Sequence, residues 1–115
     1  MTATIMTTLG TLAAMPGVRA AVAATQSDGL PAATVAAVGV DADALAAFAT
    51  ALFQRTRRAN EAAGYGETLN LALDAENGRL FIAANGDLAL VLLADRDTGA
   101  GLLRVAMQKA LRSVS

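Results

Sequence analysis

Hydrophobic positions change their spacing several times along the chain, and each change marks the boundary of a predicted element. Residues 4–15 place isoleucine and leucine at helical spacing, although a glycine and several threonines make this segment a weak helix former. Segments 18–25 and 30–38 are short and rich in alanine and valine. Because the Asp28-Gly29 pair between them favours a turn with positive φ, we expect a β-hairpin here.

Two longer helical patterns follow. Residues 41–63 are predicted to form the long helix, with Asp41 or Asp43 as its N-cap and Gly64 as its C-terminal stop. Residues 98–114 are predicted to form the last helix. Its expected apolar face consists of Leu102, Leu103, Ala106, Ala110 and Leu111.

Three alternating segments lie between these helices. Segment 67–74 alternates leucine with polar or small residues, whereas 79–85 and 87–94 are apolar on both faces. Asn77-Gly78 and Gly86-Asp87 are turn signals, so the three segments are predicted to form an antiparallel meander. An antiparallel strand that is apolar on both faces must be covered on both faces.

These elements predict one domain over residues 1–115, with the order α-β-β-α-β-β-β-α. The five strands would form one antiparallel sheet, and helices would lie on both of its faces. The expected fold is therefore a three-layer sandwich of the α/β (α+β) class.

The long helix carries three stripes along its surface instead of the usual two. The stripe of large apolar residues is assigned to the sheet: Leu45, Phe48, Ala49, Leu52, Phe53 and Thr56. A polar stripe is assigned to solvent: Asp43, Thr50, Gln54, Arg57 and Glu61. The remaining stripe is mostly small: Ala44, Ala47, Ala51, Arg55, Arg58 and Ala62.

Small side chains allow two helix axes to approach closely, so the small-residue stripe predicts a helix-to-helix interface, most simply in a two-fold homodimer. The alternative is that the stripe reflects composition. The chain has 29 alanines, and alanine fills helix surfaces because it is the best helix former.

Segment 67–74 supports the homodimer. It is expected at the edge of the sheet, and it carries no lysine or proline that would prevent pairing with another strand. Pairing with its own copy would cover this edge. The predicted dimer residues on the strand are Thr68, Asn70 and Ala72, which face away from Leu69, Leu71 and Leu73.

Composition removes many functional classes. The chain contains neither cysteine nor histidine, which excludes zinc–thiolate sites, iron–sulfur clusters, disulfides and Ser-His-Asp triads. A net charge of -1 argues against a nucleic-acid partner. Nearly all acidic residues lie at expected turns and helix starts, including Asp95 and Asp97, where such residues act as caps. We therefore expect no enzyme, no metal and no cofactor.

The segment before Arg19 lacks the basic residues of a secretory signal, and no apolar run is long enough for a membrane span. A cytoplasmic protein is expected. The cluster of Arg55, Arg57 and Arg58 is usually a solvated helix end; its functional interpretation is contact with an acidic patch on a partner protein.

Five short motifs, in this order, are similar to those of the roadblock dynein light chain domain family. They are Met15-Pro16-Gly17-Val18, Ser27-Asp28-Gly29-Leu30-Pro31, Gly64-Tyr65-Gly66-Glu67, Gly86-Asp87-Leu88 and Gly101-Leu102-Leu103-Arg104. The resemblance covers nearly the whole chain and implies a non-catalytic module that forms a homodimer through its central helix and third strand.

Bacterial members of this family look like partners and regulators of small Ras-like GTPases, some of which activate GTP hydrolysis. The resemblance therefore implies a GTPase partner. It assigns no contact residue; Arg55, Arg57 and Arg58 are candidates on charge alone. One departure is the short first helix, rich in threonine and glycine.

Two other functions are compatible with the chain. A scaffold would tether other proteins without regard to their bound nucleotide. A small-molecule sensor would require a cavity with polar groups that recognise a ligand, and such groups are scarce on the apolar faces.

Overall fold

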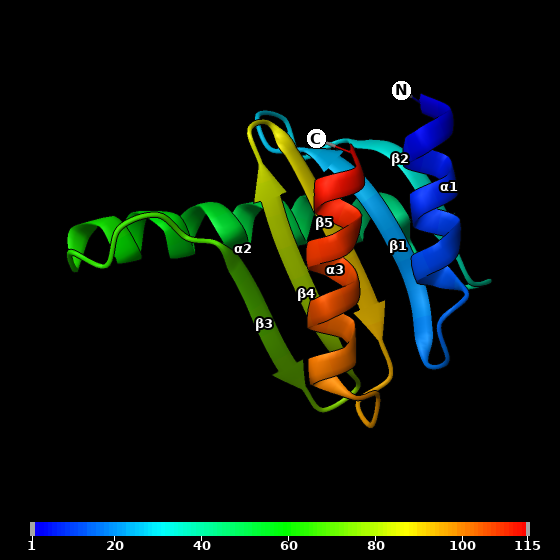
Figure 1. Ribbon diagram of the computed structural model, residues 1–115. Helices are drawn as coiled ribbons and strands as arrows, with labels where there is room; N and C mark the ends of the chain where they lie inside the picture. The colour runs from blue at the N-terminus through cyan, green and yellow to red at the C-terminus, as the bar shows by residue number, and fades with distance from the viewer. Residues whose placement is uncertain (1, 115) are drawn as a thin grey trace.

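The computed structural model describes residues 2–114; Met1 and Ser115, which the predicted domain includes, lie outside the described residues. Its elements follow the predicted order (Figure 1). They are α1 (Thr2–Ala13), β1 (Val18–Thr25), β2 (Pro31–Ala36), α2 (Ala42–Ala62), β3 (Asn70–Ala75), β4 (Gly78–Asn85), β5 (Leu88–Ala94) and α3 (Ala100–Val114).

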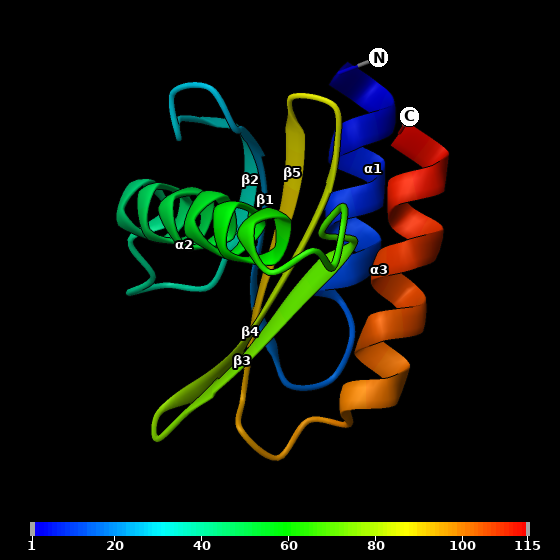
Figure 2. The same ribbon diagram turned by 90° about the vertical axis from the view of Figure 1, so that its left-hand side faces the viewer.

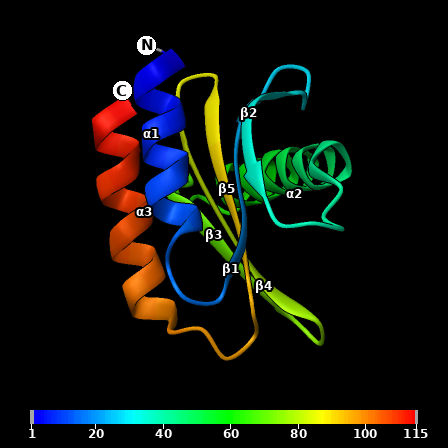
Figure 3. The same ribbon diagram turned by 90° about the vertical axis from the view of Figure 1, so that its right-hand side faces the viewer.

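The five strands form one sheet with the order β2-β1-β5-β4-β3, and every neighbouring pair is antiparallel. Figures 2 and 3 show α2 on one face of this sheet and α1 with α3 on the other. The predicted three-layer sandwich is confirmed. Among residues 2–114, β3 pairs only with β4, so its place at the sheet edge is confirmed as well.

Two apolar cores lie on the two faces of the sheet, because β1, β4 and β5 bury side chains on both sides. On the α1 and α3 face, Leu9 and Leu103 pack against Phe81 and Leu92. On the α2 face, Phe53 belongs to a second cluster of buried apolar residues. Its other buried members are Val22, Ala24, Ala46, Ala49, Leu80, Ile82 and Val91.

Several boundaries differ from the predicted ones, and local contacts explain two of them. The first helix ends at Ala13 instead of residue 15, because a residue before Pro16 disfavours helical backbone. The third strand begins at Asn70 instead of residue 67. The Asn60 side-chain amide donates a hydrogen bond to Thr68 Oγ1 (2.7 Å), which holds this segment against the end of α2.

The predicted apolar face of α3 is wrong in one position. Leu102 is 65% exposed, whereas Met107 is buried together with Leu103 and Ala110. Positions 103, 107 and 110 follow the helical spacing of four and three, so the face in contact with the sheet is rotated away from Leu102.

Candidate interaction surface on α2 and β3

α2 begins with a side-chain cap and crosses the sheet at a steep angle to the strands. Asp41 accepts a hydrogen bond from the Ala44 backbone N–H (3.1 Å), as expected of an N-cap. The helix packs on β1, β2 and β5, and Phe53 is its last buried residue. Figure 1 shows the C-terminal part of α2 extending past the β3 edge of the sheet. About half of α2 therefore lies outside the protein's own core.

The predicted small-residue stripe lies on the face of α2 that points away from the sheet. Its six residues are all exposed: Ala44, Ala47, Ala51, Arg55, Arg58 and Ala62. The buried residues Ala46, Ala49 and Phe53 occupy the opposite side of the helix. The stripe therefore contributes little to the core of a single chain.

Two assignments from the helical pattern are wrong. Phe48, assigned to the sheet, is 54% exposed, whereas Thr50, assigned to solvent, is only 3% exposed. Thr50 donates a hydrogen bond to the Ala46 carbonyl (2.8 Å) and faces Gly29 of the first hairpin turn. The hairpin turn reaches over this flank of α2, and the sequence pattern does not reveal this contact.

The buried Gln26 connects the same flank to two turns of the sheet. The side-chain amide of Gln26 donates to the Gly86 backbone carbonyl (2.5 Å), and the backbone carbonyl of Gln26 accepts from the Gln54 side-chain amide (2.5 Å). Arg57 Nη1 donates to Gln26 Oε1 (3.4 Å). Asp87 accepts hydrogen bonds from both the backbone N–H and the hydroxyl of Ser27. Gln54 and Arg57 are thus hydrogen-bonded to the first hairpin turn and not purely solvent-facing.

The three candidate arginines have different surroundings. All three are exposed, and Arg57 in addition donates a hydrogen bond to Gln26. Arg57 and Arg58 line a shallow depression of about 250 Å³ together with Gln54 and Glu61. An acidic partner group can approach this end of α2 without displacing core contacts.

The flank of α2 on the other side, toward the β3–β4 hairpin, is apolar. Leu45 and Phe48 line a groove of about 250 Å³ with Leu73 and Leu80. Phe48 and Leu52 line a second depression with Ala51 and Arg55. Sequence reasoning missed this surface because it placed the large residues of α2 against the sheet. Their spacing, with steps of three and four residues, also fits a helix face that packs against a second helix outside the chain's own core.

The predicted dimer residues on β3 fall into two groups. Asn70 and Ala72 are exposed at the open edge strand. Thr68 is 9% exposed and already bonded to Asn60, so it offers little surface to a partner. Leu69, which was not predicted to take part, is 72% exposed next to this edge.

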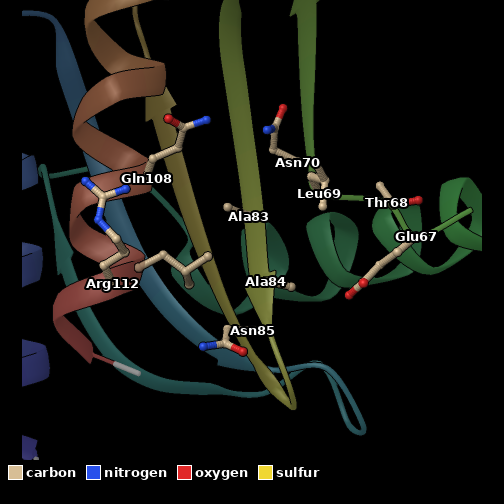
Figure 4. Close-up of a pocket in the computed structure, with 10 residues that line it drawn as sticks. Glu67, Thr68, Leu69, Asn70, Ala83, Ala84, Asn85, Gln108 and Arg112 are labelled. Carbon is tan, nitrogen blue, oxygen red and sulfur yellow. The ribbon is translucent and has the colours of Figure 1, made fainter.

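On the α3 face of the sheet, a cleft of about 300 Å³ lies beside the start of β3 (Figure 4). Gln108 and Arg112 come from α3, Asn70 from β3, and Ala83 lies at the base between them. Within residues 2–114, no three His, Cys, Asp or Glu side chains are grouped so that they could hold a metal ion. No described helix is long and apolar enough to cross a membrane.

Comparisons with known proteins agree with this architecture. The model of the Roadblock/LC7 domain matches residues 4–94. The chain is 30% identical to protein MJ1340 of Methanocaldococcus jannaschii over 87 residues. This matched region covers 76% of each chain. The crystal structure of a Roadblock/LC7 domain from Streptomyces avermitilis has a TM-score of 0.86 at 25% identity, covering 95% of this chain and 92% of that one. Myxococcus xanthus MglB shares the fold, with a TM-score of 0.85 at 18% identity and coverage of 96% and 90%.

Proposed function

The chain belongs to the Roadblock/LC7 domain family, and from this premise we propose that it is a non-catalytic, homodimeric signalling module that binds and regulates a small Ras-like GTPase in the cytoplasm. One observation supports this proposal most strongly. The strand β3 leaves one edge of the sheet open, and α2 extends past this edge and exposes the apolar side chain of Phe48 on its flank toward the β3–β4 hairpin.

In the proposed dimer, β3 pairs with its own copy across a two-fold axis perpendicular to the sheet. Such pairing covers the open edge and continues the sheet into the partner. Both copies of α2 then lie on the same face of the joined sheet, side by side. Phe48, Leu52, Ala51 and Arg55 lie on or near the flank that would face the partner.

Several predicted interface residues keep this role in the proposal. Ala62 is on the extending part of α2, and Asn70 and Ala72 are on the edge strand. Ala44, Ala47 and Arg58 are exposed on the outward side of the helix, where they would border the contact between the two copies of α2. Thr68 would support this contact from within its own chain through Asn60.

The outer surface of the two helices is the proposed contact for the GTPase. Arg58 and Arg55 are exposed there, and Arg57 is held beside them by Gln26. Guanidinium groups favour acidic patches on protein partners, and charge complementarity mainly increases the association rate and specificity. This surface lies on the opposite side of the sheet from α1 and α3.

The test uses purified protein and a small Ras-like GTPase from the same organism, loaded with GDP or a non-hydrolysable GTP analogue. We expect micromolar or tighter binding that depends on the nucleotide, and a changed rate of GTP hydrolysis or nucleotide exchange. Arg58→Glu should weaken binding at least tenfold, whereas Arg104→Glu on α3 should not. Binding that ignores the nucleotide would indicate a scaffold instead, and absence of binding would contradict the proposal.

A further inference from the structure

A groove of about 350 Å³ lies between α1 and α3, on the face of the sheet opposite α2 (Figure 2). The two helices run antiparallel, and the hydroxyl oxygens of Thr8 and Ser113 are 3.3 Å apart across the groove. Its sides are lined mainly by small residues, among them Thr8, Thr11 and Met15 on one side and Ala106, Lys109 and Ser113 on the other.

We propose that this groove binds an amphipathic helix of a partner protein, with a narrow apolar ridge and acidic residues beside the ridge. The groove and the proposed GTPase contact lie on opposite faces of the sheet. The inference therefore goes beyond the proposed function and does not depend on it. A chain with both surfaces would connect the GTPase to a second protein.

The residues along both sides of the groove have helix-packing spacing. On α3, Leu102 extends the row of groove residues by one turn, which gives steps of four, three and four residues up to Ser113. On α1, Thr4 extends the row in the same way, with steps of four and three up to Thr11. Because most of these side chains are small, a third helix axis can approach closely between the two rows. The distance from Leu102 to Ser113 along α3 is about 17 Å, or about three turns of a partner helix.

The groove presents mainly carbon atoms to a partner. Its floor includes the buried residues Leu12 and Ala110. Two of its hydroxyl groups already donate to their own helix, Thr11 to the Thr7 carbonyl (3.1 Å) and Ser113 to the Ala110 carbonyl (3.0 Å). At the end of the groove, Leu102 is 65% exposed. An apolar ridge therefore fits this surface better than a polar ligand does.

Charge specifies the residues beside the ridge. α1 has no charged residue, and α3 has three basic residues, Arg104, Lys109 and Arg112, but no acidic one. This helical layer is therefore positive in a chain whose net charge is -1. Lys109 lines the groove, and no acidic side chain of residues 2–114 forms an ion pair with it. Acidic residues of a partner would complement Lys109, whereas a second copy of the same surface would bring cations together.

The shape of the surface distinguishes a protein partner from a lipid membrane. Polybasic segments that bind anionic membranes contain roughly four to eight basic residues, more than α3 carries. The groove is also concave, so it matches the convex ridge of a helix better than it matches a flat surface.

A designed peptide tests the proposal. The probe is a helical peptide of about 18 residues, with leucine and alanine at steps of three and four and glutamate on both sides of this ridge. Titrated into ¹⁵N-labelled protein, it should bind with a Kd of about 100 μM or tighter and shift NMR signals of α1 and α3. The same peptide with lysine in place of glutamate should bind at least fivefold more weakly.

Matched variants locate the contact. Lys109→Glu should weaken binding of the glutamate peptide at least tenfold and strengthen binding of the lysine peptide, whereas Arg104→Glu, on the other flank of α3, should change neither. Thr11→Trp should fill the groove and abolish binding, while Met6→Trp, on the other side of α1, should not. Circular dichroism checks that each variant folds.

Three results would overturn the proposal. The first is no binding of the glutamate peptide, or signal changes centred on α2 and β3. The second is equal binding of the two peptides, which would exclude an acidic partner. The third is binding to phosphatidylserine vesicles that Lys109→Glu abolishes, without peptide binding, which would assign the surface to a membrane instead.

Discussion

Gly29 is the residue at which the first hairpin turn meets α2, and two separate constraints apply to it. Its φ of +69° lies in the left-handed region, and an added Cβ would lie 2.8 Å from Thr50 Oγ1. Gly66 has a φ of +81° but no atom within 4 Å of an added Cβ. Comparing substitutions at the two glycines therefore separates the cost of backbone strain from the cost of steric crowding.

We expect Gly66→Ala to lower the free energy of unfolding by about 1–2 kcal/mol, the ordinary cost of left-handed backbone for a residue with a side chain. Gly29→Ala should cost more, because the methyl group also displaces Thr50 or the turn. Urea denaturation of both variants measures the difference. Equal losses of unfolding free energy would show that the turn moves to accommodate the methyl group without disturbing α2.

Asp28 in the same turn has a lowered pKa. The Thr25 hydroxyl and then the Leu30 backbone N–H donate hydrogen bonds to its carboxylate, which lowers the pKa of Asp28 below the ordinary value of 3.8. These bonds therefore stabilise the turn fully above pH 3.8, and the contribution is lost as the pH falls through the folded-state pKa.

The expected consequence is a stability difference between wild-type protein and Asp28→Asn that depends on pH. The wild-type protein should be more stable near neutral pH, because hydrogen bonds to a charged carboxylate are stronger than those to a neutral amide. The difference should shrink toward zero as the wild-type carboxylate is protonated. Urea midpoints of both proteins over a pH series measure it; a difference independent of pH would contradict this account.

At the level of elements, the helices and strands follow from the sequence, but the rotation of a helix about its axis does not. The meander of β3, β4 and β5 can be predicted from the sequence, because the turn motifs Asn77-Gly78 and Gly86-Asp87 separate segments whose hydrophobic pattern is typical of strands. Phe48 was misplaced because a helical pattern ranks side chains by size and does not reveal what covers them. The open β3 edge was predictable from connectivity, whereas the extent of α2 beyond it depends on where the helix lies across the sheet.

The rotation of α3 gives a direct prediction. Leu103 is completely buried, while Leu102 is 65% exposed. Leu103→Ala should lower the free energy of unfolding by about 2–5 kcal/mol, the usual cost of a buried leucine. Leu102→Ala should change it by less than about 0.5 kcal/mol, as is usual for surface positions. Comparable losses in thermal or urea denaturation would mean that a partner covers Leu102.

At the scale of the whole molecule, the fold places α2 alone on one face, with half of its length beyond the sheet. A single chain buries little of this half, because no described residue of α2 after Phe53 is buried. Hydrogen bonds of Gln54 and Arg57 with Gln26, and of Asn60 with Thr68, join it to the rest of the domain. If a second copy covers it, unfolding is coupled to dissociation. The stability of the protein then depends on its concentration.

We therefore expect the unfolding midpoint of the wild-type protein to rise with concentration. Each tenfold increase is worth about 1.4 kcal/mol per dimer, which corresponds to about 3–6 °C for an assembly of this size. Phe48→Glu places a charge on the apolar flank and should remove this dependence, leaving a folded monomer. Ala47→Glu, on the far side of the exposed face, should keep it. If Ala47→Glu also abolished the dependence, the outward small-residue stripe would itself form the helix-to-helix contact of the dimer. A wild-type unfolding midpoint that does not change with concentration would argue against any dimer.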